Sequence, residues 1–218
     1  MSAAQRYNFR RRLANLKKRF ALRFETVISE SRRREVLPLL VALHHKRHRQ
    51  TGGSDAFHTP ALVAFHEELS RWALERGWLR LFVMWLDGRA AASLYGFRYG
   101  PTFFFYQSGF DPEFEKQSVG LVTLGLSIQS ASEEGVEEYD LLHGDEPYKF
   151  HWAREARDLI QVELYPPSAG GRLCHRVAGW RRSVKSILRS ALRGFPLPSG
   201  APGDRGELWG GLDAAPRS

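Results

Sequence analysis

Apolar residues recur every three or four positions in five stretches of the chain, and this spacing predicts amphipathic α-helices. The expected helices cover residues 5–20, 30–49, 60–76, 118–134 and 172–192. Thr59 and Pro60 form a typical helix start, with a threonine cap before a proline at the first helical position, and Gly77 ends that third helix. Pro38 lies within the second stretch and disfavours a helix there unless the helix begins near Leu37.

Runs of apolar, aromatic and β-branched residues predict six strands. They cover residues 22–28, 79–86, 89–98, 102–107, 138–142 and 159–165. Asp87-Gly88 is a strong hairpin signal between the second and third runs, and Gly96 is a candidate for a β-bulge. Three antiparallel strands then lead into a helix, a strand, a short helix over residues 148–156 and a last strand. This order predicts an α/β (α+β) fold with a mixed, mainly antiparallel sheet flanked by helices.

The charge along the chain is uneven. Residues 1–50 hold 14 lysines and arginines against 3 acidic residues, a net charge of +11. Residues 51–165 hold 9 against 18, a net of −9, and residues 166–218 hold 9 against 3, a net of +6. We therefore expect a basic linker helix, an acidic folded domain, a basic amphipathic helix and a disordered tail. Their expected bounds are residues 1–20, 21–166, 167–193 and 194–218.

Composition limits the classes of protein to which the chain can belong. Its 218 residues are 43% hydrophobic and 12% aromatic, as in a globular protein. The single cysteine excludes a disulfide framework and a zinc site built on cysteine pairs. No run approaches the roughly 18 to 20 apolar residues that span a bilayer, and the N-terminal residues lack the apolar region of a secretory signal. We expect a cytoplasmic protein.

A group of histidines lies at the end of the second predicted helix. His44 and His48 are four positions apart and could face one way, with His45 beside them. A metal site would need a further ligand and supporting hydrogen bonds. The expected role of these residues is a polar helix end, and no metal is expected.

The stretch from Phe103 to Trp152 is where we expect a functional site. It is predicted to form a strand, a loop, a helix, a second strand and a loop, and Gly144-Asp145-Glu146-Pro147 breaks the chain where the second strand ends. Ligands of α/β sheets lie at the carboxyl ends of strands and at helix N-termini. Both features occur within this one stretch.

The order of elements and several sequence blocks resemble the GNAT acyltransferases. The blocks are FHTPALVAFHEEL, LFVMWLDGRAAASLYGFRYG, FFYQSGFDPEFEKQSVGLV and EYDLLHGDEPYKFHW. They are similar to the acetyltransferase domain of the CelD-type family, which is linked with bacterial cellulose and exopolysaccharide production and is related to the FemAB-type transferases. The resemblance covers residues 5–165, and the chain resembles the C-terminal half of longer family members.

The resemblance implies acetyl-CoA as the acyl donor, bound where two neighbouring strands splay apart. By position these strands are residues 103–107 and 138–142, with a phosphate loop at residues 115–121. Free amides and the helix dipole at such a loop suit an anion, although an ordinary capped helix would use the same residues. The expected donor-binding residues are Tyr106, Gln107, Lys116, Gln117, Ser118, Val119, Gly120 and Leu121.

Acyl transfer from a thioester needs a general base, a donor for the developing oxyanion and an acid for the leaving thiolate. Tyr148 is the expected acid, as in many GNAT enzymes. Ser108 would line the substrate channel, and Lys149 would orient an anionic substrate or pair with Asp145. Two structural alternatives stay open, with Asp145 as a helix cap and Tyr148 as a core aromatic residue. The candidate bases are Asp145, Glu146 and His143, and Asp145 and Glu146 are alternatively ligands of a substrate amine.

Three functions are consistent with this pattern. The first is an acyl-CoA-dependent N- or O-acyltransferase acting on a small molecule or saccharide. The second is a FemAB-like transferase that uses aminoacyl-tRNA, with the basic helices 5–20 and 172–192 on RNA phosphates. The third is a non-catalytic GNAT-like module that binds a partner. The same basic helices would either contact an anionic membrane or dock on the acidic core, and no DNA partner is expected.

Overall fold

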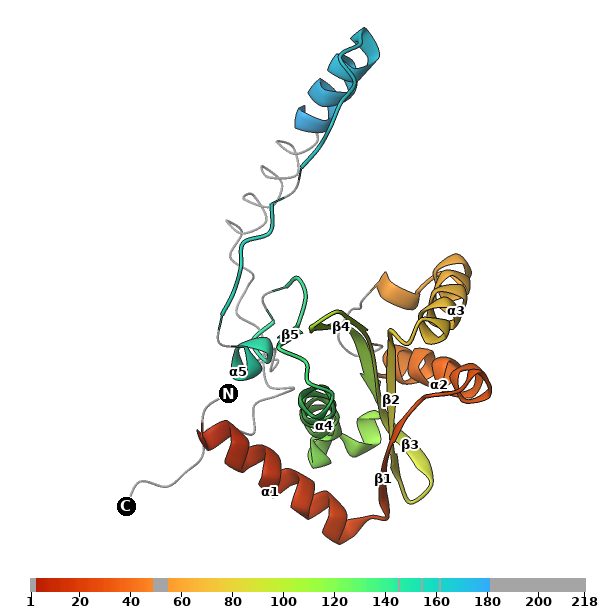
Figure 1. Cartoon of the computed structure of the whole chain (residues 1–218), viewed down its shortest axis with the longest axis vertical. Helices are drawn as coiled ribbons and strands as arrows, with labels where there is room; N and C mark the ends of the chain where they lie inside the picture. The colour runs from red at the N-terminus through yellow and green to blue at the C-terminus, as the bar shows by residue number, and fades with distance from the viewer. Residues whose placement is uncertain (1–2, 49–54, 145, 154, 161, 181–218) are drawn as a thin grey trace, which may run out of the picture. The chain divides into compact units, whose positions relative to one another are not determined.

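The computed structural model describes residues 3–48, 55–144, 146–153, 155–160 and 162–180. The chain divides into two compact units, one that extends to Ala156 and one that starts at Arg157. The first unit contains a five-stranded sheet with helices on both faces (Figure 1). No helix in the described ranges is both long and apolar enough to cross a membrane.

The elements of the first unit follow one another as the hydrophobic pattern predicts, with two short 3-10 helices (η) added. Their bounds are α1 (Ala3–Arg19), β1 (Leu22–Thr26), α2 (Glu30–His48), η1 (Asp55–Phe57), α3 (Pro60–Glu75), β2 (Leu79–Leu86), β3 (Arg89–Tyr99), β4 (Thr102–Phe110), η2 (Pro112–Gln117), α4 (Val119–Glu133), β5 (Glu138–Asp140) and α5 (Lys149–Trp152). The sheet order is β1-β2-β3-β4-β5. Strands β1 to β4 pair antiparallel, and β5 pairs parallel with β4. The predicted fold class is confirmed.

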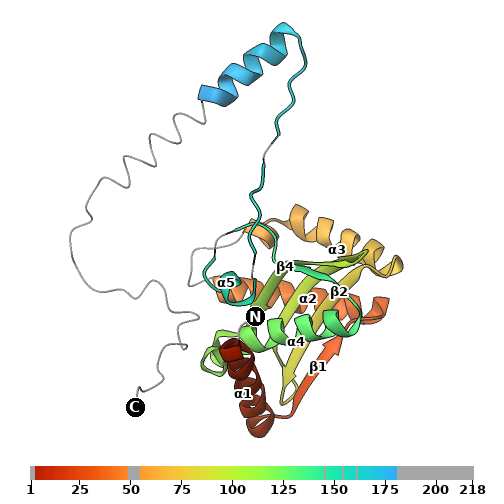
Figure 2. The ribbon, with the colours of Figure 1, turned by 60° about the vertical axis from the view of Figure 1, so that its left-hand side comes forward.

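The sheet separates two hydrophobic cores. Helices α2 and α3 cover one face, and α1 and α4 cover the other (Figures 1 and 2). Because side chains alternate along a strand, β2 supplies Leu81 and Val83 to the core under α2 and α3 and Phe82 to the core under α4. Residues of a strand that is covered on both faces are almost all apolar, as the run LRLFVMWL is.

Local signals in the sequence account for the element ends. The Thr59 side chain accepts a hydrogen bond from the Leu62 amide at 3.2 Å, so the expected cap of α3 is confirmed. Asp87 and Gly88 have φ of 49° and 79°, the left-handed pair that a two-residue hairpin needs. Gly109 permits a close approach of two backbone segments, since a Cβ atom there would overlap backbone atoms of Leu43 and His44. It lets α2 lie directly on β4.

Helix α1 packs on α4. Leu16 is buried, and the Phe9 ring occupies the space beside Gly125 that a larger residue would fill. The Phe9 ring also contacts Trp152 edge to face, with ring centroids 6.3 Å apart. The apolar side of α1 is thus occupied, while its basic residues other than the half-buried Arg12 are exposed.

Pro38 does not interrupt the second predicted helix. Helix α2 begins at Glu30, as predicted, and carries Pro38 inside it, so the alternative start near Leu37 does not occur. It is stabilised at its first turns by Arg33, which is buried and donates to Glu30, Glu67 and Ser70. The short helix expected over residues 148–156 spans only Lys149–Trp152, and Ala153 already has extended backbone angles.

Strand lengths also differ. Strand β5 ends at Asp140 rather than Leu142, because the Asp140 carboxylate accepts from the Leu142 amide and Leu142 takes a φ of 56°. Strand β4 continues to Phe110, three residues beyond its predicted end. Strand β1 ends at Thr26, before the exposed Ile28.

The second unit contradicts the last predicted strand. Residues 159–160 and 162–165 are not in a strand, and no described strand pairs with them. The side chains of Leu159, Ile160, Val162 and Leu164 are exposed. The alternation of apolar residues in this segment was therefore not sufficient to form a strand. Residues 169–180 are helical, which starts the predicted basic helix three residues early. The rest of that helix and the expected tail at 194–218 lie outside the described residues.

Candidate functional site

The strands β4 and β5 are paired over three residues and then part. Thr102, Phe103 and Phe104 face Glu138, Tyr139 and Asp140, and the Phe103 and Tyr139 rings stack at 4.4 Å. Beyond Phe104, β4 continues for six residues while the chain after Asp140 leaves the sheet. This parting of β4 and β5, which we call the splay, corresponds to the pair of splayed strands predicted from the sequence.

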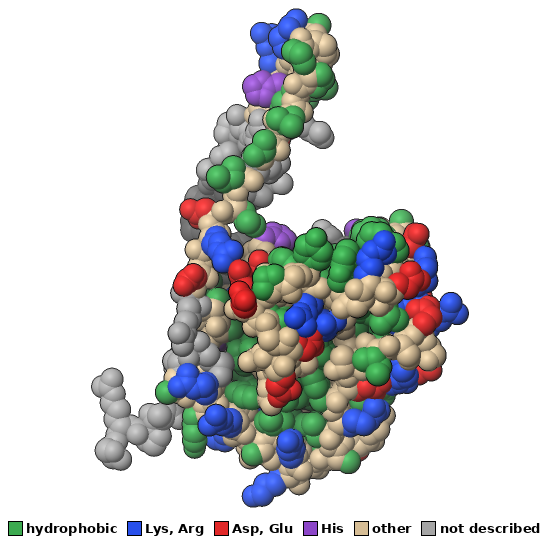
Figure 3. All heavy atoms as spheres, viewed as in Figure 1, with side chains coloured by type: hydrophobic (Ala, Val, Ile, Leu, Met, Phe, Trp, Pro, Cys, Tyr) green, Lys and Arg blue, Asp and Glu red, His purple; other side chains and the backbone are tan. Residues whose placement is uncertain are grey.

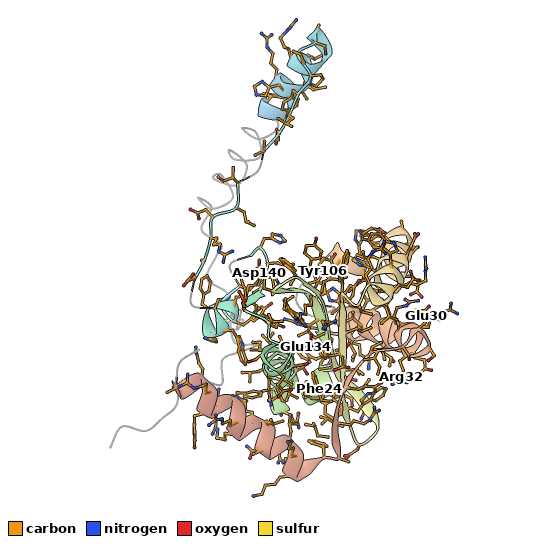
Figure 4. All side chains as sticks on the ribbon, viewed as in Figure 1. Phe24, Glu30, Arg32, Tyr106, Glu134 and Asp140 are labelled. Carbon is orange, nitrogen blue, oxygen red and sulfur yellow. The ribbon has the colours of Figure 1, made fainter. Side chains whose placement is uncertain are left out.

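A β-bulge lies in β4 beside the splay. Tyr95 pairs with Gln107 and Gly96 with Phe105, so Tyr106 is the extra residue. The expected bulge next to Gly96 is confirmed. Figure 4 labels Tyr106 and Asp140 at this end of the sheet.

The bulge turns Tyr106 toward α3. Its hydroxyl lies 3.1 Å from Nε2 of His66, which is 2% exposed. Burial lowers the pKa of His66 and raises that of Tyr106, so both groups stay neutral near pH 7. The Nδ1 atom of His66 and the buried Tyr95 hydroxyl have no hydrogen-bond partner among the described residues. This buried polar group on the α2 and α3 side of the splay was not predicted.

The last turn of α2 borders the splay. His44 Nδ1 lies 3.0 Å from the Ser108 carbonyl oxygen, and the Arg47 guanidinium donates to the Ser108 hydroxyl at 3.1 Å. Arg47 lies near Tyr148 and Glu146, whose charges influence its pKa, and burial lowers that pKa overall. His45 contacts the Phe57 carbonyl oxygen. No group of three or more potential metal ligands occurs in the part of the chain that the structure describes.

The segment after β5 forms the opposite border of the splay. Lys149 is buried and donates to the His143 carbonyl oxygen at 2.6 Å and to the Glu146 carboxylate at 2.9 Å. Lys149 therefore pairs with Glu146, while Asp145, its predicted partner, lies outside the described residues. The side chains of His143 and Glu146 are exposed.

Tyr148 is the half-buried aromatic residue of this border and packs on the core under α4. Burial raises its pKa to about 12, with a further increase from Glu146 and an opposing effect from Arg47. Burial also tends to raise the pKa of Glu146, but the Lys149 ammonium outweighs this and the pKa of Glu146 is lowered. Near pH 7 the phenol is therefore a proton donor, and the carboxylate is ionised and a weak base.

The predicted phosphate loop is helical on both sides of one residue. Residues 112–117 form η2, Ser118 has a φ of 56°, and α4 begins at Val119. Ser118 occupies the cap position, but its side chain makes no capping bond and accepts from Arg12 of α1 instead. The amides of Val119, Gly120 and Leu121 have no acceptor within the helix, as at any helix start.

A pocket lies between α1 and the end of η2, just before this helix start. It is lined by Arg12, Asn15, Leu16, Arg19, Lys116 and Gln117. Arg12 also donates to the Asn8 amide oxygen at 3.2 Å, so neither of these two acceptors of Arg12 carries a charge. Three cations beside a helix N-terminus make this pocket suitable for an anion.

The structure therefore divides the predicted site residues into two sets. Around the splay lie Tyr106, Gln107, Ser108, His143, Glu146, Tyr148 and Lys149. At the start of α4 lie Lys116, Gln117, Ser118, Val119, Gly120 and Leu121. Prediction from sequence missed Arg12, Arg47 and His66, which come from helices remote in the chain and carry no local motif.

Comparisons with known proteins identify the family of the chain. A family model described as an acetyltransferase (GNAT) domain matches residues 3–150. The chain belongs to the GNAT acetyltransferase family. The predicted GNAT fold and acyltransferase class are thereby confirmed, and the CelD-type resemblance stays a prediction. No match was found among curated proteins.

Solved structures share the fold of this GNAT domain. A possible acetyltransferase from Clostridium difficile is 11% identical with a TM-score of 0.50, covering 66% of this chain and 97% of that one. An aminoglycoside acetyltransferase from an uncultured soil metagenomic sample, in complex with trehalose, is 16% identical with a TM-score of 0.46, covering 66% and 95%. A GNAT acetyltransferase from Brucella melitensis, in complex with acetyl-CoA, is 10% identical with a TM-score of 0.46, covering 66% and 94%. At these identities the likeness concerns the fold alone.

Proposed function

We propose that this GNAT domain transfers an acetyl group from acetyl-CoA to an amine or hydroxyl of a small molecule or saccharide. The observation that supports this most is the splay, where β4 and β5 part after Phe104 and polar groups border the opening. The start of α4 follows β4 through η2, so a helix N-terminus lies beyond the end of the strand that borders the opening. An acyl donor with an anionic part and a thioester suits these two features, with the anionic part at the helix N-terminus and the thioester at the splay.

The residues beside the start of α4, from α1 and η2, fit the anionic part of the donor. Arg12, Arg19 and Lys116 supply positive charge, and the first amides of α4 supply hydrogen-bond donors. Gly120 keeps the backbone of the first turn accessible. Acetyl-CoA supplies the activated thioester when it is bound, and these residues would hold and orient it.

The residues around the splay fit proton handling. Tyr148 keeps its proton to high pH and would donate it to the leaving thiolate. The ion pair of Lys149 with Glu146 would fix the backbone at His143, because Lys149 binds both. Glu146 is then a structural partner in preference to a base, which leaves His143 and Asp145 as the bases still proposed.

The acceptor would enter from the α2 and α3 side. There the Tyr106 hydroxyl and His66 form a neutral pair beside the bulge, and Ser108 and Arg47 lie next to it. Neutral donors and acceptors suit the hydroxyl and amine groups of a sugar. The resemblance of residues 138–152 to the CelD-type family supports a saccharide acceptor and a link with exopolysaccharide or cellulose production.

Binding of acetyl-CoA to the purified full chain tests the proposal, measured by calorimetric titration. We expect binding, and we expect Arg12→Ala and Lys116→Ala each to weaken it about tenfold, because each removes one charge-assisted contact with phosphate. Lys17→Ala, at an exposed position on the same helix as Arg12, is the matched control and should bind as the native chain does.

Release of free thiol is then assayed with a panel of amines and sugars. Absence of acetyl-CoA binding at millimolar concentration would refute the proposal. Salt-sensitive binding of tRNA in its place would favour the aminoacyl-tRNA-dependent transferase, and binding of neither would favour a non-catalytic module.

A further inference from the structure

The two basic helices that flank the acidic part of the chain have different surroundings. Helix α1 uses its apolar side for packing, with Leu16 at 2% exposure and Phe9 against Gly125. Its surface side carries lysines and arginines, which are gathered along α1 in Figure 3. Because the apolar side of α1 is already packed, this helix has no exposed apolar face that could insert into a membrane.

The helix at residues 169–180 has the opposite property. Leu173, Val177 and Trp180 are 63%, 47% and 71% exposed. They are four and three positions apart, so they lie on one side of the helix and form an apolar stripe. Arg172 and Arg176 are also one turn apart and lie beside that stripe.

The sequence continues the same pattern beyond the described residues. Val184, Ile187 and Leu188 follow at helical spacing, and Arg181, Arg182, Lys185 and Arg189 alternate with them. No aspartate or glutamate occurs from residue 164 to residue 203. A basic segment with no acidic residue, a regular apolar period and a tryptophan is the composition of helices that lie in the interface of an anionic membrane.

We propose that the helix beginning at residue 169 binds the surface of a membrane that contains anionic lipids. The stripe of Leu173, Val177 and Trp180 enters the boundary between headgroups and acyl chains. Arg172 and Arg176 contact lipid phosphates, to which guanidinium groups donate paired hydrogen bonds. Because this helix belongs to the second unit, the proposal is independent of the activity of the GNAT domain.

An anionic lipid surface accounts for the stripe better than RNA does. RNA phosphates would attract the arginines equally well, but they offer no apolar phase for three exposed apolar side chains in register. Tryptophan is also the residue that prefers the headgroup level of a bilayer. The arginines and the apolar stripe together therefore favour a lipid surface over RNA as the partner of this helix.

Cys174 allows a direct measurement, because it is the single cysteine of the chain and is exposed on this helix. We would label it with an environment-sensitive fluorophore and add vesicles of phosphatidylcholine alone or mixed equally with phosphatidylglycerol. We expect a blue shift and vesicle co-sedimentation with the mixed vesicles only, weakening as salt is added.

Variants separate the contribution of the arginines to vesicle binding from that of the apolar stripe. Arg172→Gln with Arg176→Gln should weaken binding roughly tenfold or more, since each cation near an anionic surface adds about 1 kcal/mol. Leu173→Ser should abolish the blue shift while leaving weaker, salt-sensitive binding. Lys17→Gln with Lys18→Gln removes as much charge from α1 and should change binding by less than about threefold, because α1 cannot insert.

Three outcomes would overturn the proposal. The first is that the native chain does not bind the mixed vesicles at low salt. The second is that the double substitution at Arg172 and Arg176 leaves binding unchanged. The third is that Leu173→Ser still shows the full blue shift. Binding of tRNA through the same arginines, with no vesicle binding, would assign the helix to RNA. Thermal unfolding of every variant should match that of the native chain, because all substituted side chains are on the surface.

Discussion

The chemistry of the splay depends on single residues whose properties are set by their neighbours. Tyr148 is the clearest case. The sequence left open whether it is an acid or a core aromatic residue, and in the structure it packs on the core while its phenol lies near Arg47 and Glu146. A residue of this kind can serve both purposes, since the ring is buried and the hydroxyl stays near the site.

Replacing Tyr148 by phenylalanine tests the proposed acid. We expect acetyl-CoA binding to change by less than about twofold and thiol release to fall by roughly 100-fold, the lower range for loss of a general acid. The measurements are calorimetric titration and a thiol assay. Tyr7→Phe, at a position 70% exposed, is the control. An unchanged rate for Tyr148→Phe would remove Tyr148 from the mechanism.

The same substitution predicts a pH dependence of stability. Burial raises the pKa of Tyr148 to about 12, above its ordinary value of about 10. The neutral phenol therefore contributes stability that is fully present below pH 10 and is lost as the pH rises toward 12. We would measure the free energy of unfolding of the native chain and of Tyr148→Phe by denaturant titration. The difference between the two should be constant from pH 7 to 9, and above pH 10 the native chain should lose stability relative to the variant. A constant difference throughout would contradict the burial of this phenol.

At the scale of elements, the position of α2 decides which residues border the splay. Gly109 allows α2 to cross β4 in backbone contact, and this brings His44 and Arg47 to Ser108. Lys46 adds an ion pair with Asp111 at 2.8 Å, which fixes the same helix end to the start of η2. Helix α2 and the bulged strand β4 are thus fixed relative to each other, and together they position the residues that border the splay.

Gly109→Ala tests this contact. The added methyl group would overlap the backbone of Leu43 and His44, which cannot rotate away, so we expect a loss of about 3 kcal/mol or more in the free energy of unfolding. Chemical denaturation measures it. Gly179→Ala is the control, because a Cβ atom there meets nothing within 4 Å, and it should leave stability unchanged or slightly increased. Equal stability of the two variants would mean that α2 does not lie on β4 in this way.

At the scale of the whole molecule, the chain consists of two units that differ in how they bury apolar residues. The first unit encloses two cores around a sheet. In the second, Leu159, Ile160, Val162 and Leu164 are 77%, 86%, 73% and 91% exposed. Buried area is what stabilises a fold, so the two units should differ in resistance to proteases.

Limited digestion with trypsin should therefore cut first at Arg157, where the described chain has no regular structure. We expect a fragment from the N-terminus to residue 157, identified by mass spectrometry, that survives while the remainder is degraded. Arg33 and Arg80, which are held in ion pairs within the first unit, serve as internal controls and should be cut last. Early cleavage within β2 or α2 would contradict the division into units.

The order and kind of almost every element of the first unit follow from the amino-acid sequence, because apolar spacing, caps and turn residues act over a few positions. Thr59, the Asp87-Gly88 turn and the aromatic run of β4 are examples. The sequence also predicted candidate site residues at the end of β4, at the start of α4 and after β5, and these remain predictions.

Which distant side chains join these candidate residues depends on how the helices pack against the sheet. Arg12, Arg47 and His66 reach the site because α1, α2 and α3 pack on particular faces of the sheet, and no local pattern records such contacts. Tertiary packing also explains why secondary structure predicted from local sequence was wrong in one segment and why a helix tolerates a proline in another. Residues 159–160 and 162–165 form no strand, since a strand needs a neighbour for its hydrogen bonds. Helix α2 accommodates Pro38 because Arg33 and the core hold its first turns.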